Sequence, residues 1–511
     1  MTGRAFLSIL LAAISILLAP AQAAAADWLQ AETQNFVIQA DLPESELRDL
    51  ALRMEQFDRL MRAQVRGPLR PGRKHHLYLD SGIGRISDVA GKRVNSITRT
   101  WPEMAASFAQ YDPRQSAFGR NTSLFFAHAA YHQTNAYVRT VPHWLNEGLP
   151  LFFSTAYPSD GHFILGVPDT DWRMDSPMSE TRIRTILTTL SAPRDYGEWS
   201  KLQDANAVFT NLLMTDKNSD AAIGAYLRSF NSGAPLEEAM EAFGDLRVLA
   251  RDMRNRMTRK PELRQVPLDP HAPAEVFVRA MGEDEIALLV PRLKRLEDDR
   301  RESVARDLEK LAERFPDSAE AWYEHAAADF ALHKGRKKED GPLFDGLGFP
   351  GEETVIVVTA WRYSDEKAWA AVNRALAINP GHPNARRLKA QILLSRMQNA
   401  GEMDDASQFA RVRKLLAPMV ARAEEFPYAA VFNYQTYIEQ GIEAPQDAFD
   451  AFGRAFLGSA GVRDFRYAYA AELVRRGEET IARRLLESML NDPAYREAAE
   501  RALAQLAGPA T

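Results

Sequence analysis

The stretch FFAHAAYHQTNAYVRTVPHWLNEGLPLFF, residues 125–153, contains two histidines four residues apart and, fifteen residues beyond the second, a glutamate. The first part has a helical pattern, and Pro142 marks the start of a second helix. Positions four apart lie on one face of a helix, so His128 and His132 can direct both imidazoles at one point. Zinc in hydrolases takes three nitrogen or oxygen ligands from the protein and one water. Glu147 is the candidate for the third ligand.

The same stretch resembles the peptidase MA-like metallopeptidases of the gluzincin group. Members typically have His-Glu-Tyr-x-His, then Pro-x-Trp-Leu-x-Glu-Gly-x-Ala-Glu-Tyr-Phe. This chain has HAAYH from His128 and PHWLNEGLPLFF from Pro142, and flanking segments extend the resemblance over most of residues 27–257. The resemblance implies a zincin-like domain, a small sheet plus active-site helices, with His128, His132 and Glu147 as the metal ligands.

Three departures from the family pattern bear on the chemistry. Ala129 stands where the family has the glutamate that takes a proton from zinc-bound water, a role worth about 10²–10⁴ in rate. Pro150 replaces an alanine in the helix that carries Glu147, and it removes a backbone donor there. QDAN at 203–206 stands where the family has a Tyr-Ala-Gln-Ser-like phrase. These departures predict a domain without peptidase activity, and the ligand set fits both a chain that binds zinc and a chain that has lost it.

Two alternatives stay open. An active zinc-dependent peptidase would recruit a non-standard general base, for which Glu103, Glu180 and Asp204 are candidates, although no spacing argument places any of them near the histidines. A purely structural scaffold, in which the domain only supports the rest of the chain, would have neither metal nor ligand.

The remaining histidines and serines carry weaker signals. His75 and His76 follow two basic residues before a strand, and a solvated polar strand edge accounts for them. His143 lies at a variable position of the family pattern, where an ordinary surface role is favoured over a part in the metal site. Ser123 and Ser154 lack the sequence context of a nucleophile elbow, so a serine hydrolase is not supported.

Composition and the N-terminus bound the class and the compartment. The 511 residues are 46% hydrophobic and 26% charged, as in soluble globular proteins, and a net charge of -6 argues against nucleic acid as a partner. Residues 1–26 combine Arg4, about fifteen apolar residues and an Ala-x-Ala phrase, which predicts a cleavable signal peptide and a periplasmic or secreted protein. A membrane anchor is the alternative, but the run is shorter than the roughly twenty residues that span a bilayer. We therefore expect no stable membrane span after cleavage.

The rest of the chain divides into two parts by pattern. Residues 27–257 mix strands with helices, among them an amphipathic helix with apolar residues at three- and four-residue steps from Leu47 to Met61. Residues 258–275 are rich in proline and are expected to form a linker. Residues 276–511 are expected to be all helical and to resemble tetratricopeptide repeats, with a generic helical bundle as the alternative. The predicted fold class is α+β, a zincin-like domain followed by helical repeats.

Taken together, these features predict a secreted or periplasmic, degenerate zinc-metallopeptidase-like protein. We expect it to bind a peptide or a cell-envelope protein through the cleft of the former active site and through the helical repeats. No cysteine occurs in the chain, which excludes a thiolate metal site and a cysteine nucleophile.

Overall fold

The computed structural model of the chain describes residues 28–65, 73–80, 96–100, 104–111, 125–126, 128–130, 140–167, 177–259, 261–268, 275–295, 301–333, 365–459 and 462–507. The expected signal peptide, residues 1–26, lies outside these ranges, as do Glu103, Ser123 and His132. Among the helices so described, none combines the length and the apolar character needed to span a membrane.

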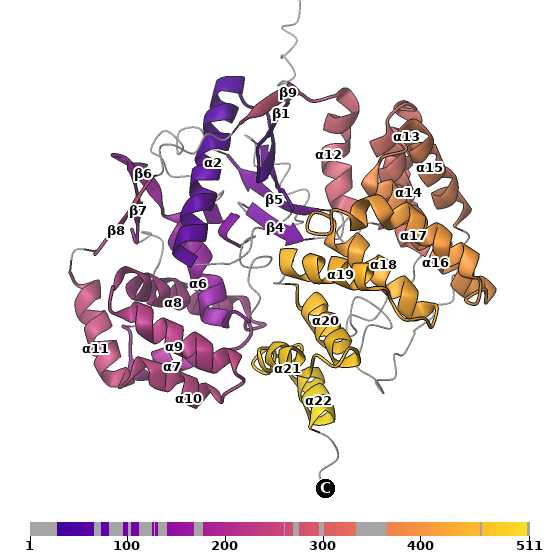
Figure 1. Ribbon diagram of the computed structural model, residues 1–511. Helices are drawn as coiled ribbons and strands as arrows, with labels where there is room; N and C mark the ends of the chain where they lie inside the picture. The colour runs from indigo at the N-terminus through magenta and orange to yellow at the C-terminus, as the bar shows by residue number, and fades with distance from the viewer. Residues whose placement is uncertain are drawn as a thin grey trace, which may run out of the picture.

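The larger of two sheets has six strands in the order β4-β5-β3-β2-β1-β9 (Figure 1). The pairs β2–β3 and β3–β5 are parallel, and the other neighbours are antiparallel. The strands are β1 (Leu29–Glu32), β2 (Phe36–Ala40), β3 (His75–Asp80), β4 (Ser96–Thr100), β5 (Ala105–Gln110) and β9 (Phe277–Ala280). Because side chains alternate along a strand, His75 and Leu77 of β3 face different layers from His76 and Tyr78.

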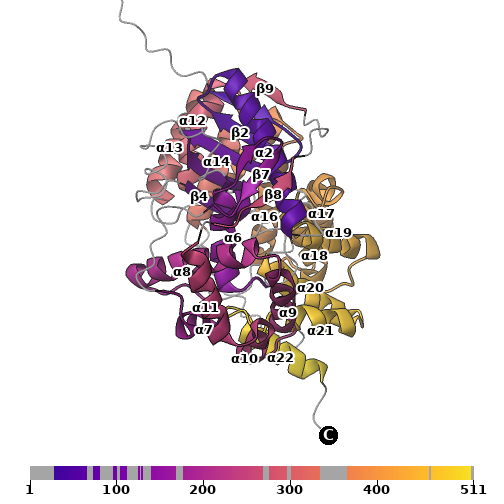
Figure 2. The ribbon, with the colours of Figure 1, turned by 90° about the vertical axis from the view of Figure 1, so that its left-hand side faces the viewer.

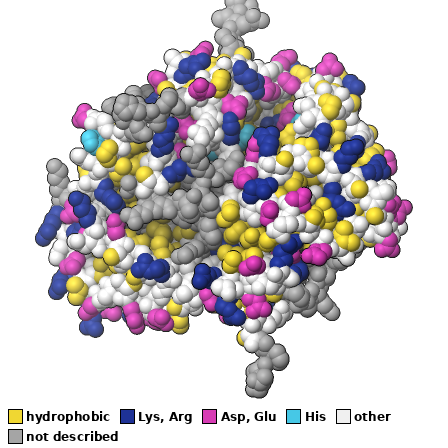
Figure 3. All heavy atoms as spheres, in the orientation of Figure 1, with side chains coloured by type: hydrophobic (Ala, Val, Ile, Leu, Met, Phe, Trp, Pro, Cys, Tyr) yellow, Lys and Arg dark blue, Asp and Glu magenta, His cyan; other side chains and the backbone are white. Residues whose placement is uncertain are grey.

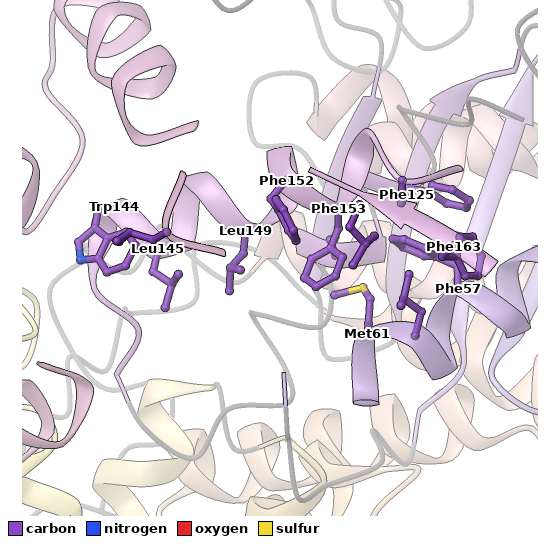
Figure 4. Packing of buried hydrophobic residues seen from close by; sticks show 14 of the residues in the cluster. Phe57, Met61, Phe125, Trp144, Leu145, Leu149, Phe152, Phe153 and Phe163 are labelled. Carbon is purple, nitrogen blue, oxygen red and sulfur yellow. The ribbon is translucent and has the colours of Figure 1, made fainter. Parts of the chain in front are cut away.

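One face of this sheet is covered by α2 (Glu44–Val65), whose predicted apolar stripe is buried in the largest core cluster. The same cluster takes in α6 (His143–Ser154), which contributes Trp144, Leu149 and Phe153 (Figure 4). Helix α6 runs through Pro150, and the carbonyl of Asn146, which loses its helical partner there, belongs to an exposed residue. The second helix expected in the decisive stretch therefore begins after Pro142 as predicted.

A smaller three-stranded sheet and a group of helices complete the first part of the chain. Helices α6 and α8 approach closely at Gly148, where a Cβ atom would lie 2.0 Å from Thr210 Oγ1 and 2.8 Å from the Asn206 carbonyl oxygen. Only glycine allows this approach. The elements are β6 (Tyr157–Ser159), β7 (His162–Leu165), β8 (Arg264–Pro267), α7 (Glu180–Thr188), α8 (Tyr196–Thr215), α9 (Ser219–Asn231), α10 (Leu236–Met240), the 3-10 helix η1 (Glu241–Phe243) and α11 (Leu246–Met257).

The stretch 258–275, expected to be a linker, carries β8, which pairs with β7. The following strand, β9, lies in the part expected to be all helical, and it pairs with β1 at the edge of the larger sheet. Helix α12 (Glu283–Arg295) then covers the second face of that sheet, where Leu289 and Leu293 pack in one cluster with Tyr78. The chain therefore continues its first sheets through the expected boundary before it becomes helical.

The remaining described elements are helices, and neighbours along the chain pack against one another. Ala371 and Ala375 are buried, as close helix packing requires, and His382 caps the helix that begins at Pro383. The helices form an arc from α12 beside the sheet to α22 near α10 (Figures 1 and 2). They are α13 (Arg301–Arg314), α14 (Ala319–His333), α15 (Glu366–Ile378), α16 (Pro383–Ala400), α17 (Ala406–Val420), α18 (Pro427–Glu439), α19 (Gln446–Gly458), α20 (Arg463–Arg475), α21 (Glu479–Glu487) and α22 (Arg496–Leu506). The protein is thus mixed α and β, mostly helical, with a helical C-terminal region.

Candidate functional site

The imidazole of His128 lies inside the protein between α2 and β3, with 1% of the residue exposed. Its Nε2 is 2.9 Å from Asp58 Oδ1, and its Nδ1 is 2.9 Å from His75 Nδ1. The Phe36 ring packs beside it, with ring centroids 4.6 Å apart. Both ring nitrogens of His128 are therefore hydrogen-bonded within the fold.

The hydrogen bonds continue from His75 to β5, where His75 Nε2 lies 2.7 Å from Ser107 Oγ. Asp58 is ion-paired with Arg62, and a carboxylate only accepts. His128 Nε2 must then donate to Asp58, so that a neutral His128 accepts at Nδ1 from His75 Nδ1–H. The remaining nitrogen of His75 accepts from the Ser107 hydroxyl. These hydrogen bonds join four buried side chains, Asp58, His128, His75 and Ser107, which we call the buried relay.

Local sequence explains why these groups meet. Glu55, Asp58 and Arg62 follow one another at three- and four-residue steps, so they form a polar stripe on α2. Glu55 accepts from the backbone and the side-chain amide of Asn35, both at 2.8 Å. His75 is the first residue of β3 and is fully buried, so the expectation that it sits on a solvated strand edge was wrong. The strand alternation carried the signal, because it puts His75 on the same face as two buried leucines.

Glu147 lies on α6 and is only partly exposed. Burial raises the pKa of its carboxyl group, and a hydrogen bond from Gln203 Nε2, 3.5 Å from Glu147 Oε2, opposes that rise. Gln203 belongs to the QDAN phrase that departs from the family pattern. Burial also lowers the pKa of His143, one turn before Glu147 on the same helix. Within the described residues, no hydrogen bond joins Glu147 to His128.

The fit of zinc to these residues can be judged from His128. Two histidines and one carboxylate are a suitable donor set for zinc, but Asp58 and His75 take both ring nitrogens of His128. In this arrangement His128 has no nitrogen left for a metal, so the described part of the site does not fit zinc. Across the described ranges, no group of three or more histidine, aspartate or glutamate side chains is placed so that it could hold a metal ion. His132 lies outside those ranges.

Ala129 and the two candidate bases within the described ranges, Glu180 and Asp204, are not joined to His128 by a hydrogen bond or an ion pair. Ala129 is completely buried in the main core cluster. Glu180 begins α7 and pairs with Arg247 at 3.3 Å and, more loosely, with Arg184 at 3.9 Å. Asp204 is a partly exposed residue of α8. Neither carboxylate has a contact with His128 among the described residues.

A second polar cluster, not expected from the sequence, lies on the other side of the sheet between α12 and α14. Glu324 is 1% exposed and accepts from Arg292 Nε at 2.7 Å and from Arg295 Nε at 2.6 Å. Glu320 accepts from Arg292 at 2.5 Å and lies 2.6 Å from His382 Nε2. Burial alone would raise the pKa of Glu320, but the charges around it, Arg292 first, lower it to about 2. We call these five residues the buried ion cluster.

Comparison with protein-family models, with curated proteins and with solved structures finds no match to this chain. The function proposed below is therefore argued from the residues and their geometry.

Proposed function

We propose that the chain is a non-catalytic, gluzincin-like protein of the periplasmic or secreted space, and that it binds a peptide or a cell-envelope protein. One observation carries the proposal: His128 has both ring nitrogens hydrogen-bonded inside the protein, and a buried alanine follows it. In a working zinc peptidase the first residue would donate to the metal and the second would be the general base. In this chain His128 is hydrogen-bonded in the interior and Ala129 packs in the hydrophobic core.

The edge of the larger sheet supports a binding role. In the described sheet β4 is the outermost strand on its side, and its known partner is β5. An edge strand presents one row of backbone N–H and C=O groups, to which an extended peptide can add as a further strand. This mode of binding needs no metal and no general base, so it is compatible with Ala129 and with the buried relay.

Metal content and peptide cleavage test the non-catalytic part. Elemental analysis is made on the full-length protein purified without chelator, for wild type, His132→Ala and Glu147→Gln. We expect the same low zinc content in all three and no chelator-sensitive cleavage of a peptide library, including after Ala129→Glu. One zinc per wild-type chain that is lost in both variants, together with chelator-sensitive cleavage, would refute the proposal. His132 and Glu147 are used because the buried His128 is also needed for the core.

Proline substitutions in β4 test the binding part. Successive residues of a strand direct their N–H groups to opposite edges, so Ile97→Pro and Thr98→Pro form a matched pair. The substitution at the residue whose N–H points toward β5 should break a hydrogen bond of the β4–β5 ladder and lower the stability. The substitution at the other residue should remove only an N–H donor on the outer edge of β4. With a library of extended peptides as the probe, we expect the variant that lacks the outer N–H donor to lose peptide binding while its stability stays unchanged. No binding by wild type would favour a purely structural scaffold, whereas binding that survives both substitutions would place the peptide site away from the β4 edge.

A further inference from the structure

The segment that leads into α6 is bonded to the last helices of the chain. Thr140 lies two residues before Pro142, whose carbonyl accepts the first backbone hydrogen bonds of the helix. The Thr140 hydroxyl donates to the Ser488 carbonyl at 2.5 Å and accepts from Arg466 Nη1 at 2.9 Å. Residues more than 300 positions away therefore hold the entry to the helix that carries Glu147.

Arg466 is suited to a specific rather than a solvated contact. It lies on α20, is 2% exposed, and is among the largest fully buried side chains of the described residues. Burial lowers the pKa of its guanidinium to about 10, and the nearby Asp492 carboxylate opposes that effect. A buried guanidinium is costly unless it is paired, so its bond to Thr140 is an ordered, directional contact.

Two asparagine side chains form further hydrogen bonds in the same region. Asn231, at the end of α9, donates to the Thr140 carbonyl at 3.1 Å. Asn491, four residues beyond the end of α21, donates to the carbonyls of Phe230 at 2.8 Å and Ala234 at 3.1 Å. Gly233 has a positive φ of 78°, and a Cβ atom there would lie 2.4 Å from Leu490 Cδ1. Backbone and side chains of both parts are thus fitted closely together, where Figures 1 and 2 both place α21 and α22 near α10.

We propose that α20 and the residues that follow α21 act as a clamp on the start of α6, so that the C-terminal helices set the position of the helix carrying Glu147. The clamp consists of Arg466 and Ser488, which hold Thr140, and of Asn491, which holds the carbonyls of Phe230 and Ala234. This inference goes beyond the proposed function and does not depend on whether zinc or a peptide is bound.

Hydrogen–deuterium exchange of full-length variants tests the clamp. Thr140→Val removes the hydroxyl at nearly constant shape, and Arg466→Met removes the guanidinium without leaving a charge behind. We expect the exchange of α6 amides, residues 143–154, to rise about tenfold in both variants, since each loses a hydrogen bond to a charged or carbonyl partner. Amides of α2 should be unchanged. Thr140→Ser, which keeps the hydroxyl, should restore wild-type protection.

The matched control is Arg463→Gln on the same helix. Arg463 pairs with Asp492 at 3.1 Å, is largely exposed, and has no bond to the first part among the described contacts. This variant should leave α6 exchange unchanged. Exchange that rises only in α20–α22 after Thr140→Val and Arg466→Met would overturn the proposal, because the contact would then be structural for the last helices alone. A uniform rise over the whole chain would also overturn it, since the bonds would then support global stability rather than α6.

Discussion

His75 and His76 are neighbours in sequence but lie on opposite faces of the larger sheet, and the two faces use different physics. His75 belongs to the buried relay, in which hydrogen bonds run from Ser107 through His75 and His128 to Asp58. His76 is partly exposed on the face of α12, where burial, then the charges of Arg292 and Arg73, lower its pKa to about 4. One face is held by directional bonds between mostly neutral groups, and the other by charges.

The comparison shows two ways in which the free-energy cost of burying a polar group is offset. In the relay the polar groups are hydrogen-bonded to one another, so these directional bonds offset the free-energy cost of burial. In the buried ion cluster two guanidinium groups and two carboxylates neutralise one another, so the cost is met by charge, and loss of one partner exposes the others. The two faces should therefore respond differently to substitution and to pH.

The largest effect is expected on the charged face, from Glu324→Ala. The substitution leaves Arg292 and Arg295 without the carboxylate that pairs both of them in the interior. We expect the free energy of unfolding to fall by about 3–5 kcal/mol, measured by urea denaturation at pH 7. Glu309→Ala is the control, because Glu309 pairs with Lys367 at the surface and should cost less than about 1 kcal/mol. Equal losses for the two variants would show that the ion cluster does not behave as a buried one.

A somewhat smaller effect is expected on the relay face, from Asp58→Ala. His128 then lacks an acceptor for Nε2–H, but Arg62 is 21% exposed in its side chain and can turn to water. We expect a loss of about 3 kcal/mol in the same measurement. Asp49→Ala, on the exposed side of α2, should change stability by less than about 0.5 kcal/mol. A loss for Asp58→Ala as small as that of the control would mean that the relay is not maintained in solution.

The smallest effect is also expected on the charged face, as a dependence of stability on pH that comes from His76. The folded pKa of His76, about 4, lies below its ordinary value of 6.5, so the unfolded chain binds the proton more readily. The stability that the neutral His76 contributes to the folded state is fully present above pH 6.5 and is lost as the pH falls toward 4. Because the side chain is partly exposed, we expect about 1 kcal/mol, seen as a fall in the urea midpoint. His76→Gln should remove that part of the pH dependence, and an unchanged profile would contradict the assignment.

Acid should affect the buried ion cluster in a lower range. The pKa of Glu320 is about 2 in the folded protein against an ordinary value of 4.5. A carboxyl group with a lowered pKa contributes stability above 4.5 and loses it as the pH falls toward 2. The two ranges can therefore be distinguished in one titration.

Local pattern was sufficient for several elements. The apolar stripe of α2, the start of α6 after Pro142 and the helical character of the C-terminal region follow from residue spacing, because periodicity reports which side of a helix is buried. The spacing of His128 and His132 predicts that they share one face of a helix, and His132 lies outside the described residues. The spacing could not say what that face meets, and for His128 the partners come from Asp58 and His75, 70 and 53 positions away.

The sequence by itself thus determined the local faces of the chain: which residues of α2 are apolar, where α6 begins, and that alanine follows His128. Only the tertiary structure decided how these faces are paired. It placed β8 and β9 in the sheets of the first part, turned His75 inward, and brought Thr140 to Arg466 across more than 300 residues. The physical reason is that periodicity depends on neighbours along the chain, whereas the partner of a buried polar group is set by the packing of segments that are far apart in sequence.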